Sequence, residues 1–387
     1  MGTYGRYLFR HLPELAGLAF AVWIQFHFAY WGTRTGFGRR SLKLRLASWA
    51  AALLLAGWCV FGVLAHFPSG YRSLPASMPV YWLRGGALAW AFASVCAYFV
   101  LLLWRRMPEF DPARRGFIQT AGTLAVAAPF GVLGFGMFIQ RSAFRVTEVE
   151  VPVANLAPEL NGLRIAHLSD IHMSPFLSEA ELARAVGLAN ELKPHLGVIT
   201  GDFITSEGDP LEACLRQLAR LKAEAGLVGC MGNHEVYARC QDAAEQIGRR
   251  VGIDLLRKRR REFRFGNAVL NVAGVDWQRP PRMLSGTARL LVPSATNIML
   301  SHNPNAFDAA AEQGWDLTLA GHTHGGQINV EILEKGLNPA RFFTDYVYGP
   351  YRKGSSSLYV TRGIGTVGLP ARIGAPPEVA LIRLCAI

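Results

Sequence analysis

Eight polar side chains of the types that bind metals or transfer protons follow five short apolar runs in this chain. They are Asp170, His172, Asp202, Asn233, His234, His302, His322 and His324. Each run of about five apolar residues, bounded by Gly or Ser, is typical of a buried strand, and the segments Ser178–Leu192 and Pro210–Ala225 have helical spacing. Alternating strands and helices predict a parallel sheet, whose strands end at one shared edge. We therefore expect these side chains to lie close together.

The residue types in this set favour transition-metal chemistry. Carboxylate oxygens, an amide oxygen and imidazoles suit Mn²⁺, Fe or Zn²⁺, and the set contains no thiolate that would favour a softer ion. All of them except His234 are candidate ligands, which is too many for one ion with an open position but suits two ions that share a carboxylate. A single histidine such as His302 could equally be packed in the core. Five polar strand ends in one pattern argue against that interpretation for the set.

The order of these motifs resembles a known family. The blocks Asp170-x-His172, Gly201-Asp202, Gly232-Asn233-His234-Glu235, His302 and Gly321-His322-x-His324 resemble those of the calcineurin-like metallophosphoesterases. The segments Gly321–Gln327, Tyr348-Gly349, Thr361–Gly363 and Pro376–Glu378 resemble the membrane-associated YkuE/YaeI-type branch. The resemblance covers about 240 residues at the end of the chain. It implies an α/β metallophosphoesterase fold over residues 142–387, with two packed mixed β-sheets flanked by helices.

The resemblance also implies a role for each residue. It places Asp170, His172 and His324 on one metal ion, Asn233, His302 and His322 on a second ion, and Asp202 between them as a bridge. His234 would face the substrate, where it would protonate the leaving oxygen or stabilise charge in the transition state. Two divalent ions in such a site activate water and clamp an in-line displacement. Glu235 is expected to orient His234 or to cap the next helix, and His167 and His195 to be structural.

Charge divides the chain into two parts. Residues 1–149 hold 15 Lys and Arg against 4 Asp and Glu, whereas residues 150–387 hold 25 against 24, within a formal net charge of +12. The basic excess therefore belongs to the first part and not to the part with the metal motifs. Basic motifs interleaved with aromatic residues are also missing, so we expect no nucleic-acid partner.

The first part has the length and hydropathy of membrane spans. Four segments of about 20 residues or more are mostly apolar: Leu12–Trp31, Leu46–Phe67, Leu83–Trp104 and Phe117–Gln140. About 20 apolar residues suffice to cross a hydrocarbon core of about 30 Å. Leu12–Trp31 fits least well because it contains Glu14, Gln25 and His27. We expect a membrane domain of about four helices over residues 1–141; a buried soluble bundle fits four such runs poorly.

The loops between these segments indicate an orientation. Thr33–Arg45 carries five basic residues and Arg105–Arg115 carries four, whereas Pro68–Trp82 contains only Arg72. By the positive-inside rule the first and third loops are cytoplasmic. The chain is then an integral protein of the inner or cell membrane, with its catalytic domain on the outer (periplasmic or extracellular) face. Arg114-Arg115 also resembles a twin-arginine signal, but positive flanking of a span explains it better.

The combined expectation is a membrane-anchored dinuclear-metal phosphoesterase that hydrolyses a phosphomonoester or phosphodiester. Its partners are the bilayer and a phosphoester, and the membrane part favours a lipid-linked one. The alternatives are a UDP-diacylglucosamine-type pyrophosphohydrolase of lipid metabolism, a non-catalytic metal-binding membrane sensor, and a transporter, which the short loops and uncharged spans fit poorly. An intact His234 favours an enzyme over a sensor. The basic run Arg257–Arg261 is either a solvated face or a site for an anionic lipid headgroup or a polyanionic substrate.

Overall fold

The computed structural model describes residues 12–34, 41–64, 78–106, 115–154, 156–279, 283–332 and 335–386. Within it the chain forms two units. The first comprises Met1–Met137 with Gly368–Pro370, and the second comprises Phe138–Val367 with Ala371–Ile387.

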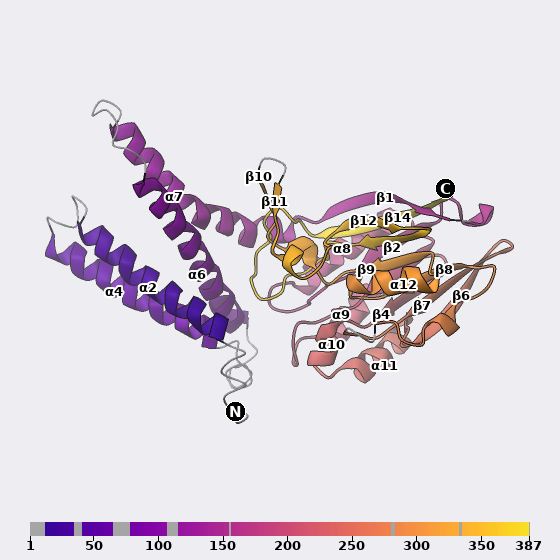
Figure 1. The fold of residues 1–387 in the computed structure, drawn as a ribbon. Helices are drawn as coiled ribbons and strands as arrows, with labels where there is room; N and C mark the ends of the chain where they lie inside the picture. Colours follow the sequence, from indigo (N-terminus) through magenta and orange to yellow (C-terminus); the bar gives the residue numbers. More distant parts are fainter. Residues whose placement is uncertain are drawn as a thin grey trace, which may run out of the picture. The chain divides into compact units, whose positions relative to one another are not determined.

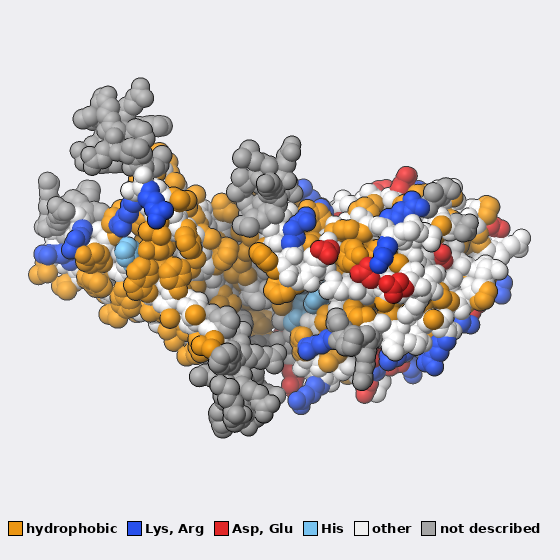
Figure 2. Space-filling model, in the orientation of Figure 1, with side chains coloured by type: hydrophobic (Ala, Val, Ile, Leu, Met, Phe, Trp, Pro, Cys, Tyr) orange, Lys and Arg blue, Asp and Glu red, His pale blue; other side chains and the backbone are white. Residues whose placement is uncertain are grey.

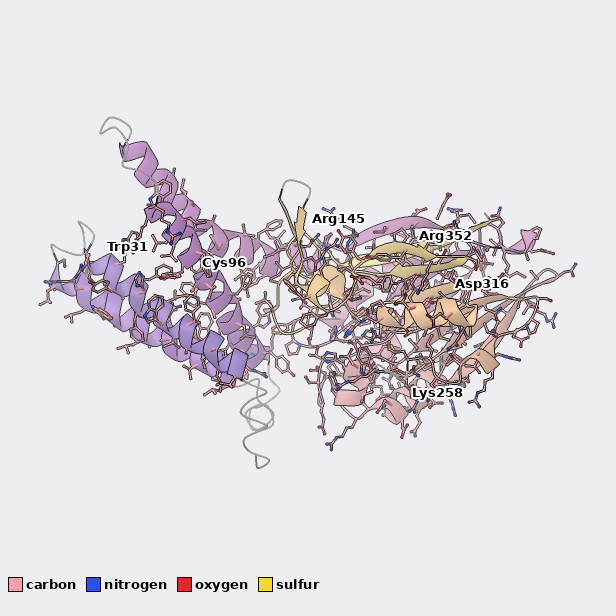
Figure 3. The ribbon with its side chains drawn as sticks, viewed as in Figure 1. Trp31, Cys96, Arg145, Lys258, Asp316 and Arg352 are labelled. Atoms are coloured by element: carbon pink, nitrogen blue, oxygen red, sulfur yellow. The ribbon has the colours of Figure 1, made fainter. Side chains whose placement is uncertain are left out.

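The first unit consists of long apolar helices (Figure 1). They are α2 (Leu12–Arg34), α4 (Leu42–Leu64), α6 (Met78–Arg105) and α7 (Arg115–Phe138). Figure 2 shows hydrophobic side chains over much of their surface. Trp31 lies near the end of α2 (Figure 3), and the Arg105 guanidinium lies 5.5 Å from the centre of its ring. Aromatic and basic side chains at helix ends suit a membrane interface.

Within the described residues, three stretches are long and apolar enough to cross a membrane: Leu42–Leu64, Met78–Arg105 and Thr120–Ser142. They correspond to three of the four segments that the sequence predicts. The fourth, Leu12–Trp31, forms α2 but is not among these three, so its membrane crossing stays a prediction. The side chain of Glu14 and the loop residues Arg39, Arg40, Arg72 and Arg114 lie outside the described part of the structure.

The first sheet of the second unit has six strands in the order β1-β14-β2-β3-β4-β5. Their bounds are β1 Arg145–Val153, β14 Glu378–Ala386, β2 Arg164–Leu168, β3 Leu196–Thr200, β4 Leu227–Cys230 and β5 Ile253–Leu255. β2 to β5 run parallel, β14 pairs antiparallel with β2, and β1 pairs parallel with β14. The carboxyl ends of β2, β3 and β4 therefore share one edge.

The second sheet also has six strands, in the order β12-β13-β9-β8-β7-β6. Their bounds are β12 Gly349–Lys353, β13 Ser356–Val360, β9 Leu317–Ala320, β8 Thr296–Leu300, β7 Ala268–Gly274 and β6 Arg259–Phe265. The four inner strands run parallel and the two outer strands antiparallel to them. A separate hairpin joins β10 (Val330–Ile332) and β11 (Lys335–Leu337). Two mixed sheets confirm the fold that the family resemblance implies.

Buried side chains hold the two sheets together in layers. One cluster lies between the sheets and includes Ile165, Val198 and Ile298. On the other side of the first sheet, α8 (Glu179–Glu191), α9 (Leu211–Leu218) and α11 (Gln241–Val251) add their apolar faces to a second cluster. A third joins α12 (Phe307–Gln313) to β7 and β8. Strands covered on both faces are continuous apolar runs, which is why the sequence reveals them.

Short helices complete the second unit. They are η2 Gln140–Ser142, η3 Pro158–Leu160, α10 Asn233–Tyr237, η4 Ala288–Leu290, η5 Pro304–Ala306, η6 His324–Gly326 and η7 Pro339–Phe342. α8 begins with a capping box, in which the Ser178 hydroxyl accepts from the Glu181 N–H and the Glu181 carboxylate accepts from the Ser178 N–H. Such reciprocal bonds satisfy donors that the first turn of a helix leaves free.

Candidate metal centre

The structure brings all eight predicted side chains to the edge where the two sheets end. Asp170 and His172 follow β2, Asp202 follows β3, Asn233 and His234 begin α10 after β4, His302 follows β8, and His322 and His324 follow β9. The loops of the two sheets interlock at this point, since the N–H of His322 donates to both carboxylate oxygens of Asp170, at 2.9 and 3.0 Å. The site is therefore formed by packing one sheet on the other.

Two motif glycines permit this close approach. A Cβ on Gly321 would lie 2.1 Å from the Ser169 hydroxyl oxygen and 2.3 Å from Oδ2 of Asp170. A Cβ on Gly232 would lie 2.1 Å from Oδ1 of Asp202. Real side chains do not approach so closely, so any larger residue would push the loops apart. The glycines of the GHTH and GNHE motifs thus set the spacing of the ligands.

Five of the eight residues adopt left-handed backbone conformations. Their φ angles are 52° for Asp170, 47° for His172, 54° for Asp202, 73° for His322 and 54° for His324. Residues with a Cβ seldom occupy this region, which costs on the order of 1–3 kcal/mol each in sparsely populated cases. Such a concentration of unfavourable conformations at one edge is typical of a functional site that the rest of the fold supports.

The ligand atoms form two groups of the size that holds a metal ion. Within each group all candidate atoms lie within 4.8 Å of one another; one group is Asp170, His172 and His324, and another is Asp202, His302 and His322. In the first, Nε2 of His324 lies 3.1 Å from Nε2 of His172 and 3.3 Å from Oδ1 of Asp170. A third group combines His172 and Asp202 with His234.

Asp202 connects the two principal groups. Its Oδ2 lies 3.5 Å from Nε2 of His172 in one group and 3.0 Å from Nε2 of His302 in the other. Its Oδ1 accepts a hydrogen bond from the N–H of His234 at 2.8 Å. The side chain is only about 2% exposed. A buried carboxylate between two sets of imidazoles has the position that a bridging ligand requires.

The chemistry of these residues fits divalent metal ions. The buried Oδ1 of Asn233 has no hydrogen-bond partner among the residues described, although a buried acceptor of this kind is usually paired. Two imidazole nitrogens at 3.1 Å cannot both be donors, and a shared cation would satisfy both. Buried carboxylate, amide and imidazole groups are the donor set that Mn²⁺, Fe and Zn²⁺ accept.

Backbone and side-chain acceptors fix the orientation of the imidazole rings. Nδ1 of His302 lies 2.5 Å from the carbonyl oxygen of Thr200, so this nitrogen carries the proton and Nε2 is left as the ligand atom. Nδ1 of His172 lies 3.2 Å from the hydroxyl of Thr205. Hydrogen bonds of this type select the tautomer of a metal-binding histidine and hold its ring in place.

His234 is held by the same loop. Its Nδ1 lies 2.6 Å from the carbonyl oxygen of Thr205 and therefore donates to it. The ring stands edge-on to that of His172, with 4.6 Å between the centroids. The side chain is partly exposed, unlike the buried His172, His302 and His324. This arrangement leaves Nε2 as the nitrogen available for proton transfer.

Burial and neighbouring charges set the protonation of the site. Burial lowers the pKa of His324 to about 3 and that of His322 to about 4, so both are neutral imidazoles at pH 7. Burial also lowers the pKa of His302, but the carboxylates of Asp202 and Asp170 outweigh it and raise the pKa to about 10, so Nε2 of His302 holds a proton that a bound metal ion would have to displace. In return, His302 and His234 outweigh burial and hold the pKa of Asp202 well below its usual range.

Glu235 fastens two of the ligand loops to each other. Its fully buried carboxylate accepts from the N–H of Gly232 at 2.7 Å, of Asp202 at 2.9 Å and of Phe203 at 2.8 Å. The first of these bonds caps α10, as the sequence suggests for this residue. The other two hold Asp202 itself. Glu235 therefore positions the central ligand and is not exposed to substrate.

Three contributors to the site are not evident from the sequence. The hydroxyl of Thr205 contacts Nδ1 of His172, and its carbonyl oxygen accepts from Nδ1 of His234. Arg372 is fully buried, and its guanidinium donates to the carbonyl oxygens of Gly365 and His324 and approaches Nδ1 of His324 at 3.4 Å. Trp277 follows β7 at the same edge, with its ring centroid 4.7 Å from that of His322. Its buried Nε1 lacks a hydrogen-bond partner among the described residues.

The remaining histidines that the sequence sets aside have structural contacts. Nε2 of His167, which is fully buried, lies 2.8 Å from the hydroxyl of Thr200. Nδ1 of His195 accepts from the N–H of Arg164 at 2.9 Å, at the amino end of β3. Neither belongs to a group of candidate ligands in the described part of the chain.

The basic run Arg257–Arg261 is largely paired with acidic side chains. Arg257 contacts Asp242, Glu245 and Asp276, while Arg259 and Arg261 both contact Asp254. Lys258 (Figure 3) precedes β6, which is an outer strand of its sheet. Charged side chains on an edge strand prevent pairing with other chains. These contacts favour the solvated-face interpretation over a lipid site.

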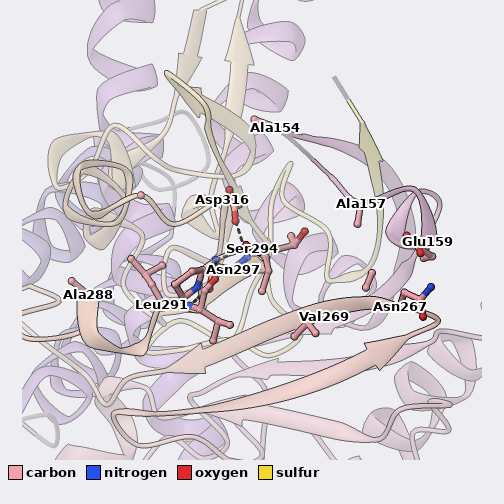
Figure 4. A pocket seen from close by; sticks show the side chains of 16 residues that line it. Ala154, Ala157, Glu159, Asn267, Val269, Ala288, Leu291, Ser294, Asn297 and Asp316 are labelled. Atoms are coloured by element: carbon pink, nitrogen blue, oxygen red, sulfur yellow. Dashed lines mark hydrogen bonds between the residues drawn. The ribbon is translucent and has the colours of Figure 1, made fainter.

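A cavity of about 730 Å³ lies at the opposite edge of the second sheet (Figure 4). It is lined by the amino ends of β7 and β8 and by Asp316, which precedes β9. Oδ2 of Asp316 accepts from the N–H of Asn297 at 2.7 Å. None of the eight predicted site residues lines this cavity. The cavity is thus separate from the candidate metal centre.

Two mixed sheets with a cluster of carboxylate, amide and imidazole ligands at their shared edge define a metal-dependent phosphoester hydrolase. Residues 163–326 match the family model described as calcineurin-like phosphoesterase. A relative from Danio rerio, named transmembrane protein with metallophosphoesterase domain, is 33% identical over 300 residues, which cover 73% of this chain and 67% of the relative. The chain belongs to the calcineurin-like metallophosphoesterase family.

Two bacterial relatives match nearly over their whole length. The uncharacterized metallophosphoesterase YkuE of Bacillus subtilis (strain 168) is 28% identical over 284 residues, covering 70% of this chain and 97% of the relative. The phosphodiesterase YaeI of Escherichia coli (strain K12) is 29% identical over 289 residues, covering 70% and 99%. These similarities confirm the branch that the GHTHGGQ motif and the C-terminal segments indicate.

Proposed function

We propose that this chain is a membrane-anchored phosphoesterase that uses two divalent metal ions to hydrolyse a phosphomonoester or phosphodiester, with a lipid-linked ester as substrate. The observation that carries the proposal is the position of Asp202, whose Oδ2 lies 3.5 Å from His172 and 3.0 Å from His302, one from each group of ligand atoms. The helices of the first unit support the anchoring, because three stretches have the length and hydropathy of membrane spans.

Seven residues would hold the ions. Asp170, His172 and His324 would bind one ion, and His302 and His322 the other, with Asp202 shared between them. Asn233, whose buried Oδ1 has no partner among the described residues, would complete the second set. An amide at position 202 would offer one good oxygen and no charge, so a carboxylate is needed there. The neutral oxygen of Asn233 leaves the site cationic enough to attract a phosphate. When bound, the ions supply Lewis-acid activation of water and of the phosphoryl oxygens.

His234 would serve the leaving group. Its Nδ1–H is committed to Thr205, so only Nε2 can carry the proton that the leaving oxygen needs. Its partial exposure leaves it accessible to a substrate, whereas the ligand histidines 172, 302 and 324 are buried. A positioned proton donor typically contributes 10²–10⁴-fold to the rate. A sensor that only binds metal would have no need for this side chain.

The test is the metal content and activity of the full chain purified in detergent. We expect two transition-metal ions per chain and metal-dependent hydrolysis of an aryl phosphoester. Asp202→Ala should lose both, whereas Glu191→Ala, which removes an exposed carboxylate at the end of α8, should lose neither. Full activity after chelation, or in Asp202→Ala, would overturn the proposal. A panel of monoesters and diesters, soluble and lipid-linked, then identifies the substrate class.

A further inference from the structure

An exposed pair of aromatic side chains stands beside the metal edge. Phe342 and Phe343, here called the aromatic ridge, are each 82% exposed, which is more than any other exposed large hydrophobic residue in the described part of the structure. The ridge lies at the end of η7. Neighbouring large apolar side chains that are this exposed usually mark an interaction surface.

The ridge is attached to the loop that carries His324. The buried side chain of Asn338 caps η7, its Oδ1 accepting from the N–H of Ala340 at 3.0 Å. Its Nδ2 donates to the carbonyl oxygen of Gly325 at 2.9 Å, one residue after the ligand. Gly326 leaves the space for this contact, because a Cβ there would lie 1.9 Å from Oδ1 of Asn338.

A second attachment comes from the loop that carries His302. Asn305 lies three residues after this ligand, and its Nδ2 donates to the carbonyl oxygen of Phe343 at 3.4 Å. Its Oδ1 accepts from the hydroxyl of Thr344 at 2.5 Å. The ridge is thus held by the loops after β8 and β9, both of which end at the metal edge. The loops that carry the ligands therefore also hold the ridge in its exposed position.

We propose that the aromatic ridge inserts into the surface of the phospholipid bilayer and brings the metal edge to phosphoesters carried on lipids. The bilayer would be the one in which the chain is anchored, since three of its stretches have the length and hydropathy of membrane spans. Aromatic side chains are favoured at the boundary between headgroups and acyl chains. The exposed Arg341 beside the ridge suits the phosphates of that layer. In the run Arg257–Arg261, by contrast, Arg257 and Arg259 are paired with the carboxylates of Asp276 and Asp254.

This inference rests on the proposed function, because it names the substrate class of the same site as a phosphoester in the membrane plane. It also makes a claim that does not depend on activity, namely that the ridge touches lipid. A photoreactive benzoylphenylalanine in place of Phe342, in the full chain reconstituted into phosphatidylethanolamine and phosphatidylglycerol vesicles, tests that claim directly.

We expect irradiation to attach phospholipid to the peptide that contains residue 342, as detected by mass spectrometry. The control is the same substitution at Asn267, an exposed residue in the turn between β6 and β7 at the opposite edge, which should capture no lipid. Attachment to a second copy, attachment to the chain's own helices, or equal lipid capture at both positions would overturn the proposal.

Kinetics give the second readout. Phe342→Ser combined with Phe343→Ser should lower the ratio of activity on phosphatidic acid in vesicles to activity on a soluble aryl phosphoester by about tenfold or more. Phe342→Trp with Phe343→Trp should restore the ratio, because Trp also favours the interface. An unchanged ratio in the serine variant contradicts the ridge proposal alone. A wild-type chain without activity on the soluble ester contradicts the proposed function, while the crosslinking result still decides the ridge.

Discussion

Nε2 of His302 lies 3.0 Å from Oδ2 of Asp202, although the two residues follow strands of different sheets. Asp202 follows β3 in the first sheet and His302 follows β8 in the second, a hundred residues later in the chain. The contact can form only when the sheets pack through the apolar cluster between them. The metal centre therefore depends on the folded core, because each of the two principal ligand groups combines residues that follow strands of both sheets.

Replacing His234 separates catalysis from metal binding. His234→Ala removes a partly exposed ring that donates to Thr205 but leaves the seven predicted ligands in place. We expect metal content to be unchanged and kcat to fall by about 10²–10⁴-fold, the scale of a general acid. Elemental analysis and steady-state kinetics on an aryl phosphoester check this. His195→Ala serves as the control, since His195 lies at the amino end of β3. Loss of a metal ion in His234→Ala would instead make His234 a ligand.

Trp277 offers a buried N–H at the same edge. Its indole Nε1 has no partner among the described residues, and its ring lies 4.7 Å from that of His322. Trp277→Phe keeps an aromatic ring beside His322 and removes the donor. If the N–H contacts a phosphoryl oxygen, kcat/KM should fall about 10- to 100-fold, because a bond to a charged group contributes about 1.5–3 kcal/mol. Metal content should not change.

The matched control for this variant is Trp315→Phe. Trp315 is buried before β9, and its Nε1 lies 3.3 Å from Oε1 of Gln313, so its replacement removes a hydrogen bond away from the metal edge. It should lower the thermal midpoint of unfolding and leave kcat/KM intact. Undiminished kcat/KM in Trp277→Phe would show that the indole N–H does not reach the substrate.

The sequence predicts the ligand-bearing strands because each is an apolar run covered on both faces, and each ends in a polar motif. β2 and β3, for example, are buried along almost their whole length and lead directly to Asp170 and Asp202. The parallel order of β2, β3 and β4 then follows from the helices between them. This local pattern suffices to expect the eight side chains at one edge.

Other contributors depend on contacts that no local pattern encodes. Trp277 is not a ligand type, and its position beside His322 arises only from the pairing of β7, β8 and β9. Arg372 reaches His324 across 48 residues of chain. β12 has no strand pattern in the sequence, because Gly349–Lys353 contains Pro350 and exposed polar residues, which an antiparallel outer strand tolerates. The left-handed backbone of the ligands is likewise a product of the packed loops.

Acid should destabilise the second unit through His167. Burial lowers the pKa of this histidine to about 3, well below the usual value of 6.5. Between these two values the unfolded chain binds a proton that the folded chain does not, so stability is present above pH 6.5 and is lost as the pH falls. Between pH 6.5 and pH 3, one such group lowers the free energy of unfolding by about 1.4 kcal/mol for each pH unit.

His167→Gln tests this effect, because Gln can bond the hydroxyl of Thr200 but cannot be protonated. Unfolding of the full chain in detergent is followed from pH 6 to pH 4 for both proteins. The free energy of unfolding should fall less steeply in the variant, by the equivalent of one proton. Parallel pH profiles would show that His167 takes up its proton without unfolding.

The orientation of the second unit is a prediction from charge. The first and third loops together hold nine basic residues, of which Arg114-Arg115 directly precedes the last span. α7 supports a crossing by its length: it is continuous over 24 residues with Pro129 inside, or about 36 Å at 1.5 Å per residue. If Leu12–Trp31 does not span, only the N-terminus changes side, because the third loop and α7 keep their places.

Reporter fusions decide the orientation. A phosphatase reporter that is active only in the periplasm should be active when joined after residue 145, at the start of β1, and silent when joined near Pro108 in the third loop. A cytoplasm-active fluorescent reporter at the same two points should give the opposite result and controls for expression. Both patterns follow from the bases that flank the spans, which remain on the cytoplasmic side. The reverse outcome would require the last apolar segment to lie in the interface or re-enter, would place the metal centre in the cytoplasm, and would make a nucleotide-linked lipid the better candidate substrate.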